Sequence, residues 1–327
     1  MGLRDARRLL EEIPNKIRDV LGIMADVNLR SKGGKEYLEI VVDPYPNPVS
    51  YKGEYHYRSG STKQELKGAA LDRFILRKFG AHWDGVSIPK VKIKDLSKTA
   101  VNTFRKLSRE SKRLDSALLR ESIPGLIDKL QLMDGPRLKR AAVLLFHPEP
   151  ERFFTGAFVK IGYFQTESEL VYHDEIHGDL FTQASKTMDI LFTKYLKAAI
   201  SYRGIQRIES FPVPEEALRE TILNAIIHRD YSVASPIQIR VYGDRLKIWN
   251  PCELPENWSL EMLMKQHSSR PFNPSIANAF FRAGEIEAWG RGSRESLMPV
   301  VTAGLLSLRL TIRRAICGSN FHLPHPI

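Results

Sequence analysis

Hydrophobic and polar side chains follow each other along this chain with two different periods. An apolar residue at every third or fourth position predicts amphipathic helices, and this spacing occurs within 4–22, 67–80, 178–200, 215–232 and 275–283. Alternating or clustered β-branched and aromatic residues predict strands, and these occur within 37–46, 51–62, 157–164, 236–243, 245–251 and 307–314. Helices and strands are therefore predicted to be mixed along the whole chain.

The order of these elements predicts the fold class. The apolar run Ala141–Phe146 is interpreted as a buried strand that follows a turn at 134–136 and a short helix. Gly243-Asp244 lies between two strand patterns and is a hairpin signal. We therefore expect an α+β protein whose later part is an α/β sandwich, with helices over one face of a mixed sheet. The predicted regions are a small α+β domain at 1–88, a helical connector at 89–138, and the sandwich at 139–327.

Charge adds a candidate partner to this picture. The chain of 327 residues has a formal net charge of +11, and such an excess favours polyanions, although it also serves solubility alone. The stretch from Lys90 to Arg113 contains nine Lys or Arg residues and only two acidic residues, Asp95 and Glu110. This stretch either follows a nucleic-acid backbone, with Phe104 packed inward, or is a solvated linker and helix. The candidate nucleic-acid contacts in it are Lys90, Lys92, Lys94, Lys98, Arg105 and Lys106.

Several classes of protein are not favoured by the sequence. No apolar run approaches the ~18 residues of a membrane span, and the first residues are too charged for a signal peptide. Two cysteines, Cys252 and Cys317, are too few for a disulfide framework or a zinc site, which favours the cytoplasm. The pattern G-x-x-x-x-G-K-[ST] does not occur in the sequence. A helicase motor built on that phosphate-binding loop is therefore not expected.

One predicted helix carries polar residues at a regular spacing. In "EEALRETILNAIIHRDYS", residues 215–232, the polar side chains form a slanting stripe of Glu216, Glu220, Asn224 and His228. The opposite, core-facing side is formed by Leu218, Ile222, Ala225 and Ile226. The stripe is either an ordinary solvated face or the lining of a site. In a site, the carboxylate of Glu220 can orient a water, and the amide oxygen of Asn224 can bind Mg²⁺ that carries phosphates.

This helix and the residues after it resemble a known family. "ETILNA" is similar to the Glu-x-x-x-Asn-Ala box of the GHKL ATPases (gyrase, histidine kinase and MutL type). The segment from about 205 to 310, with "SPIQIRVYGDRLKIWNP" and "SRPFNPSIANAFFRAGEIEAWGRG", resembles the degenerate GHKL-type domain of bacterial putative transcriptional regulators, often labelled RecG-like helicases. Those proteins also carry a Schlafen AlbA-type DNA-binding domain.

The resemblance implies roles for individual residues, with ATP and Mg²⁺ as cofactors. It makes Glu220 the candidate general base and Asn224 the Mg²⁺ ligand. Asn250 takes the place of the aspartate that reads adenine, and Cys252 stands where a glycine is expected. The residues that it places near the phosphates are Arg270, Gly290, Arg291 and Gly292. His228 lies at the end of the helix, where a cation is favoured, and no further role is assigned to residues 228–230.

A weaker resemblance covers residues 13–85. "PVSYKGEYHYRSGSTKQELKGAALDRF" is similar to the last part of the AlbA-type domain, whose first half has no counterpart here. Within it, "YRSGST" either holds a phosphate with the help of Arg58 or is a plain hairpin turn.

Taken together, these features favour an ATP-binding, DNA-binding regulatory protein with weak or no ATP hydrolysis. The alternative is a DNA-binding scaffold with a vestigial nucleotide pocket. An RNA-directed nuclease is a third hypothesis, but no cluster of three acidic residues in 1–88 supports it. Association of the chain with a second copy of itself is left open.

Overall fold

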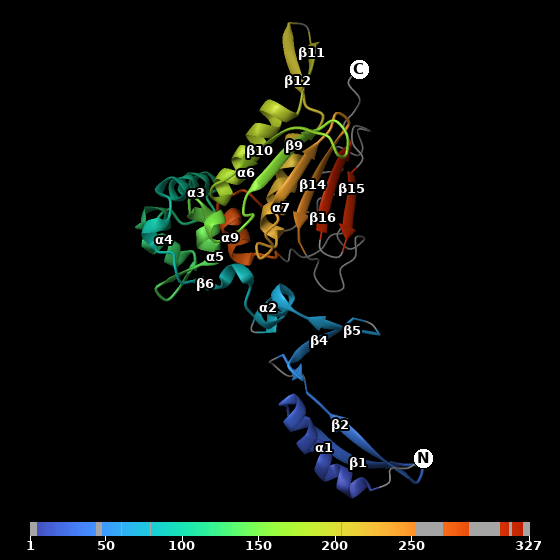
Figure 1. Cartoon of the computed structure of the whole chain (residues 1–327). Helices are drawn as coiled ribbons and strands as arrows, with labels where there is room; N and C mark the ends of the chain where they lie inside the picture. Colours follow the sequence, from blue (N-terminus) through green and yellow to red (C-terminus); the bar gives the residue numbers. More distant parts are fainter. Residues whose placement is uncertain are drawn as a thin grey trace. The chain divides into compact units, whose positions relative to one another are not determined.

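The structure is a computed structural model of the 327-residue chain (Figure 1). It describes residues 5–43, 48–59, 61–78, 80–203, 205–252, 271–287, 308–313 and 316–322. Within it the chain divides into two compact units, Met1–Trp83 and Asp84–Ile327.

The first unit contains two small sheets, each with a helix beside it in the sequence. Helix α1 (Ala6–Leu21) ends at Gly22, whose φ of 66° suits a glycine that terminates a helix. The hairpin β1 (Asp26–Lys32) and β2 (Lys35–Val41) follows, with Leu29 opposite Leu38. The rest of the unit is β3 (Ser50–Tyr51), β4 (Glu54–Ser59), β5 (Thr62–Leu66) and α2 (Gly68–Lys78). The prediction from sequence included β2 and α2 but not β1.

The basic segment lies near the start of the second unit and contributes apolar side chains to its core. Helix α3 (Lys98–Ser111) starts at Ser97, whose hydroxyl accepts the N–H of Ala100 at 3.2 Å. Phe104 of α3 is fully buried, and its ring lies 5.7 Å from that of Phe146 and 5.8 Å from that of Phe181. The predicted inward packing of Phe104 is confirmed. The other elements of this part are β6 (Ser87–Ile88), η2 (Ile93–Asp95), η3 (Leu118–Arg120), α4 (Ile123–Lys129), β7 (Met133–Asp134), β8 (Arg137–Lys139), α5 (Arg140–Phe146) and η4 (Pro150–Arg152).

A six-stranded mixed sheet forms the centre of the second unit. Its order is β10-β9-β13-β14-β16-β15, with β9 and β13 parallel and the other described neighbours antiparallel. The strands are β9 (Val159–Phe164), β10 (Leu170–Ile176), β13 (Ile237–Val241), β14 (Arg245–Pro251), β15 (Leu308–Arg313) and β16 (Ile316–His322). The remaining elements are α6 (Leu180–Ile190), η5 (Leu191–Tyr195), β11 (Ala199–Arg203), β12 (Gln206–Ser210), α7 (Glu215–His228) and α9 (Pro274–Arg282).

Helices α6 and α7 lie together on one side of this sheet (Figure 1). The burial of β13 and β14 alternates accordingly. Ile237, Ile239 and Val241 are buried, while Gln238 and Arg240 between them are half-exposed. In β14, Leu246, Ile248 and Asn250 are buried in the same way. The structure is therefore a mixed α+β fold with a two-layer α/β sandwich, as predicted.

The apolar run 140–146 is a helix, so its prediction as a strand was wrong. All residues of α5 from Ala141 to Phe146 are buried. A short segment that is buried on every side shows neither helical nor strand periodicity, and its pattern cannot distinguish the two. The short helix predicted before it is strand β8.

Two other predictions also need correction. The helix predicted over 178–200 is α6, which continues as one π-type turn, η5, to Tyr195, after which the hairpin β11–β12 begins. The last strand is β16 rather than β15, and β16 lies between β14 and β15.

Candidate functional site

The polar stripe predicted on residues 215–232 lies on helix α7. The helix begins after Pro214 and carries Glu215 and Glu216 in its first turn, where negative charge is favourable. The predicted core-facing residues Leu218, Ile222, Ala225 and Ile226 are all buried. Asn224 is exposed, and Glu220 and His228 are half-buried. Among the described residues, the stripe is thus the accessible face of α7.

The C-terminal end of α7 is fixed by side chains that donate hydrogen bonds to its last carbonyl groups. The last carbonyl groups of a helix have no partner inside it. Here the amide of Asn250 donates to Ala225 O at 2.9 Å, and Tyr231 Oη donates to Ile226 O at 3.0 Å. The amide of Asn273 donates to Ile227 O at 2.7 Å and to Arg229 O at 2.8 Å. Helix α7 is therefore held at its C-terminal end by residues of β14 and of the start of α9.

Asn250 is left with an unused acceptor. The side chain is 4% exposed, and its Oδ1 is buried without a hydrogen-bond partner. The bond from Nδ2 to the Ala225 carbonyl fixes the orientation of the amide, because the reverse orientation would bring two oxygen atoms together. A buried acceptor without a donor costs free energy. Oδ1 of Asn250 is therefore suited to a ligand that supplies an N–H or O–H group.

Asn273 performs a function that its place in the sequence does not suggest. An Asn before Pro at the start of a helix is expected to cap that helix. Instead, Asp84 Oδ2 accepts the N–H groups of Ser275 and Ile276 at 2.7 and 3.1 Å and thereby caps α9. The Asn273 amide is free to bind the end of α7. This coupling of three segments was missed by the sequence analysis.

Arg229 fixes the loop between α7 and β13. The residue is 1% exposed, and its Nη2 donates to Val233 O at 3.0 Å and Ser235 O at 2.8 Å. The guanidinium also lies 4.5 Å from the ring centre of Tyr231. Burial lowers the pKa of Arg229, although an arginine remains protonated in proteins. These contacts assign a structural role to part of the segment 228–230.

The other predicted nucleotide contacts cannot be placed in the same way. Arg270, Gly290, Arg291 and Gly292 lie outside the described residues. In the part of the chain that the structure describes, no group of three or more His, Cys, Asp or Glu side chains could hold a metal ion. A metal at Glu220 or Asn224 would accordingly take most of its ligands from a phosphate group and water, which is usual for Mg²⁺.

The predicted nucleic-acid contacts of the basic segment are mostly at the surface. Lys90, Lys92, Lys94, Lys98 and Lys106 are exposed. On α3, at 100° per residue, Lys106 and Arg109 lie on the side roughly opposite Phe104, whereas Lys98 and Arg105 lie toward its flanks. Arg105 differs from the others because it is half-buried and its Nη2 donates to Glu121 O. Arg58, in β4 of the first unit, is exposed.

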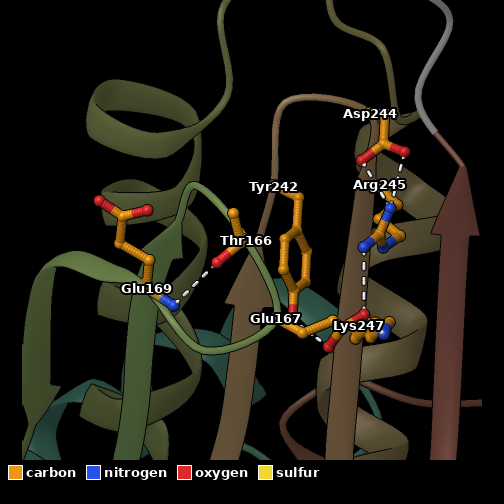
Figure 2. Close-up of polar contacts among 7 residues, drawn as sticks. All are labelled: Thr166, Glu167, Glu169, Tyr242, Asp244, Arg245 and Lys247. Carbon is orange, nitrogen blue, oxygen red and sulfur yellow. Dashed lines mark hydrogen bonds and ion pairs between the residues drawn. The ribbon is translucent and has the colours of Figure 1, made fainter.

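The sheet face opposite α7 carries a separate cluster of charges, shown in Figure 2. Glu167, from the loop between β9 and β10, accepts hydrogen bonds from Lys247 (2.5 Å), Tyr242 (3.0 Å) and Arg245 (3.1 Å). The bonds from Lys247 and Tyr242 lower the pKa of Glu167 to about 2. The loop is closed by the N–H of Glu169, which donates to Thr166 Oγ1 at 3.1 Å. The alternation of β14 separates this cluster from Asn250.

Comparison with protein families gives one match to a described family. Residues 234–311 match the family model described as putative ATP-dependent DNA helicase recG C-terminal. The match includes β13, β14 with Asn250, and α9 with the preceding Asn273, and it ends within β15. It begins after α7, so Glu220 and Asn224 lie outside it. No curated protein sequence matches the chain.

Comparison with solved structures supports the fold. The DIP2311 protein from Corynebacterium diphtheriae, a structural genomics target, is similar with a TM-score of 0.60 and 18% sequence identity. The similarity covers 97% of this chain and 63% of that protein's chain. At this identity the likeness is one of fold. None of the helices in the described part of the chain has the length and apolar character of a membrane span.

Proposed function

We propose that the chain is an ATP-binding and DNA-binding regulatory protein whose ATP turnover is slow or absent. The nucleotide site would include Asn250, near the end of β14, and the polar stripe of α7. The similarity of 234–311 to a family described as ATP-dependent supports nucleotide binding. The proposal does not include strand separation, because the chain has no phosphate-binding loop of the G-x-x-x-x-G-K-[ST] type.

The observation that carries the proposal is the buried, unpartnered Oδ1 of Asn250. The exocyclic amino group of adenine is a hydrogen-bond donor and would satisfy this acceptor. Guanine and hypoxanthine carry an acceptor oxygen at the same ring position, and an acceptor cannot replace the missing donor. The single buried amide therefore favours adenine over the other purine bases.

The α7 stripe would serve the phosphate end of the nucleotide. The amide oxygen of Asn224 would hold Mg²⁺, which when bound neutralises phosphate charge. The carboxylate of Glu220, one helical turn earlier and half-buried, would orient a water and accept its proton. Arg270, Gly290, Arg291 and Gly292 are proposed as phosphate contacts because of their sequence positions in the family resemblance.

The N-terminal unit and the connector would supply the nucleic-acid contacts. The proposal includes a partial Schlafen AlbA-type domain at 1–88, with Arg58 on its exposed β4, and the exposed lysines of the connector at 89–138. The GHKL-like domain would occupy 139–327. The observation in favour is that α3 exposes Lys98 and Lys106 while its Phe104 is buried in the core.

A base-discrimination experiment tests the nucleotide site. Calorimetric titrations of the whole chain with Mg²⁺ and the non-hydrolysable analogues of ATP, GTP and ITP would give three dissociation constants. A hydrogen bond to a buried acceptor is worth about 1–3 kcal/mol, so the ATP analogue is expected to bind about tenfold more tightly than the other two. Equal binding of all three analogues would contradict the role of Asn250.

A further inference from the structure

The central sheet of the second unit has one face that the described helices leave open. Helices α6 and α7 lie on the side to which Ile239 and Ile248 point (Figure 1). Successive side chains of a strand point to opposite faces, so the residues between these apolar positions lie on the other side. The half-exposed residues there are Lys160, Phe164, Gln238, Arg240, Lys247 and Trp249. We call this surface the open face.

Two aromatic side chains of the open face stand next to glycines. A Cβ on Gly162 would lie 2.7 Å from Cε2 of Phe164, so the Phe164 ring occupies the space that a larger residue on β9 would fill. On β14, Trp249 stands directly opposite Gln238 of β13 and Gly318 of β16. One of its two cross-strand neighbours therefore has no side chain. Trp249 forms no hydrogen bond or ring contact with the described residues, and its half-exposed indole is available for stacking.

Arg240 is a cation of the open face without an acidic partner among the described residues. Its guanidinium lies 5.2 Å from the ring centre of Phe164, which is its one contact of this kind in the described part of the chain. It stands directly opposite Lys247 on β14, and like charges in this position are unfavourable. Lys247 is neutralised by Glu167, as Figure 2 shows. Arg240 is thus left to bind an anion from outside the chain.

Arg240 and Trp249 are diagonal neighbours on the sheet. Such residues lie about 7–8 Å apart, and Gln238, opposite Trp249, adds an amide that both donates and accepts hydrogen bonds. A nucleotide of a single strand offers the matching groups, because its phosphate is anionic and its base has a flat face and a polar edge. We propose that the open face binds single-stranded nucleic acid, with a base stacked on Trp249, its edge at Gln238 and a phosphate at Arg240.

This surface goes beyond the proposed function and is separate from the sites named there. Asn250, next to Trp249 in β14, is buried on the opposite side of the sheet and bonded to α7. The exposed lysines of the connector would contact phosphates of a single strand and of a duplex alike. In a duplex the base faces are covered by neighbouring base pairs, so stacking on Trp249 requires a single strand.

Substitutions on the open face test this inference in the whole chain. Anisotropy titrations would use a labelled thymidine oligonucleotide of about 15 residues and a duplex of the same length. Trp249→Ala is expected to bind the single strand about tenfold more weakly than the wild type, as loss of one stacked base implies. Arg240→Gln is expected to bind it about fivefold more weakly at about 0.1 M salt, because one phosphate contact is lost. Both variants should bind the duplex as the wild type does.

Two further variants separate stacking from structural effects. Trp249→Phe keeps an aromatic ring and is expected to retain most of the affinity for the single strand. The single strand should quench tryptophan fluorescence in the wild type, and most of this quenching should be absent in Trp249→Phe. Lys186→Gln is the matched control for charge, because it removes an exposed cation from α6, on the helix-covered side. Thermal unfolding would show that all variants are folded.

The outcomes distinguish this inference from the proposed function. If the wild type does not bind the single strand, or if Trp249→Ala and Arg240→Gln bind it as Lys186→Gln does, the inference is wrong, and the duplex titrations still decide the role of the connector. If sedimentation shows a wild-type dimer that Trp249→Ala dissociates, the open face is an interface between two copies and the inference is also wrong. Selective loss of single-strand binding in Trp249→Ala and Arg240→Gln supports it.

Discussion

At the scale of single residues, Asn250 shows why an amide occupies a position where the resemblance leads one to expect an aspartate. Its Nδ2 donates to the Ala225 carbonyl at the end of α7, a bond that a carboxylate cannot make. Its Oδ1 is buried without a hydrogen-bond partner. One side chain thus stabilises the helix that carries Glu220 and Asn224, and it leaves the acceptor that we propose for a base.

Replacement of this amide is expected to destabilise the fold. Asn250→Asp would place a carboxylate oxygen against the Ala225 carbonyl in a buried site, and Asn250→Ala would leave that carbonyl without a donor. Each change should lower the free energy of unfolding by about 1–3 kcal/mol near neutral pH, with the aspartate variant more affected. Urea denaturation measures the difference. Unchanged stability of Asn250→Asp would show that the bond to Ala225 is unimportant.

Glu167 gives a prediction about pH. Its folded-state pKa of about 2 is below the ordinary value of 4.5, so the fold favours the carboxylate. The resulting stabilisation is present above about pH 4.5 and is lost as the pH falls toward 2. Because the side chain is 59% exposed, we expect less than about 1 kcal/mol. The difference in unfolding free energy between wild type and Glu167→Gln, measured in urea, should shrink between pH 6 and about pH 3. A difference that is independent of pH would contradict this prediction.

At the scale of elements, helix α7 was predictable because its pattern is strongly periodic. The spacing of Leu218, Ile222, Ala225 and Ile226 identified its buried face correctly. The same spacing identified the stripe with Glu220 and Asn224, whose chemical roles remain proposals. The side-chain bonds at the end of α7 and the start of α9 were not predictable, because Asn273 and Asp84 bind backbone groups 44 to 192 residues away.

Two elements whose conformation depends on distant parts of the chain were the least predictable. Helix α5 has no polar face and therefore no readable period, so it was taken for a strand. Strand β16 was missed although it lies between β14 and β15 in the sheet. In both cases the conformation depends on neighbours that come from distant parts of the chain.

Substitutions on the α7 stripe test the separate roles proposed for Asn224, which would bind Mg²⁺, and Glu220, which would orient a water. Asn224→Ala should abolish the Mg²⁺ dependence of nucleotide binding, because it removes the proposed ligand oxygen. Glu220→Gln should bind nucleotide as the wild type does and should lose any residual hydrolysis. Glu216→Gln, one turn earlier on the same exposed face, is the matched control. Calorimetry and a phosphate-release assay give the two readouts, and equal effects of all three substitutions would contradict specific roles.

At the scale of the whole molecule, the basic connector is part of the second unit, because α3 shares an aromatic cluster with α5 and α6. Four of the nine basic residues of this segment, Lys98, Arg105, Lys106 and Arg109, are therefore carried on a packed helix. Polyanion binding by such a surface releases counterions and depends steeply on salt.

Nucleic-acid binding by the whole chain is expected to be weakly sequence-specific and to weaken strongly with salt. Anisotropy titrations with a labelled duplex at about 50 and 200 mM salt would measure this dependence. Replacing the exposed Lys98 and Lys106 with Gln should reduce the slope of log K against log salt by about two. Arg105→Gln should affect the slope less, because its guanidinium is bound to Glu121 O. An affinity that is indifferent to salt would remove the nucleic-acid proposal.

The central proposal for the whole molecule is a nucleotide site shared by α7 and β14. Its most direct test is a calorimetric titration of the wild-type chain with a non-hydrolysable ATP analogue, with and without Mg²⁺. An amide in place of a carboxylate makes base recognition weaker, since charge-assisted hydrogen bonds are roughly twice as strong as neutral ones. We predict Mg²⁺-dependent binding with a Kd between about 1 μM and 1 mM, or about −8 to −4 kcal/mol. No Mg²⁺-dependent affinity for any nucleotide would contradict the account and favour a DNA-binding scaffold with a vestigial pocket.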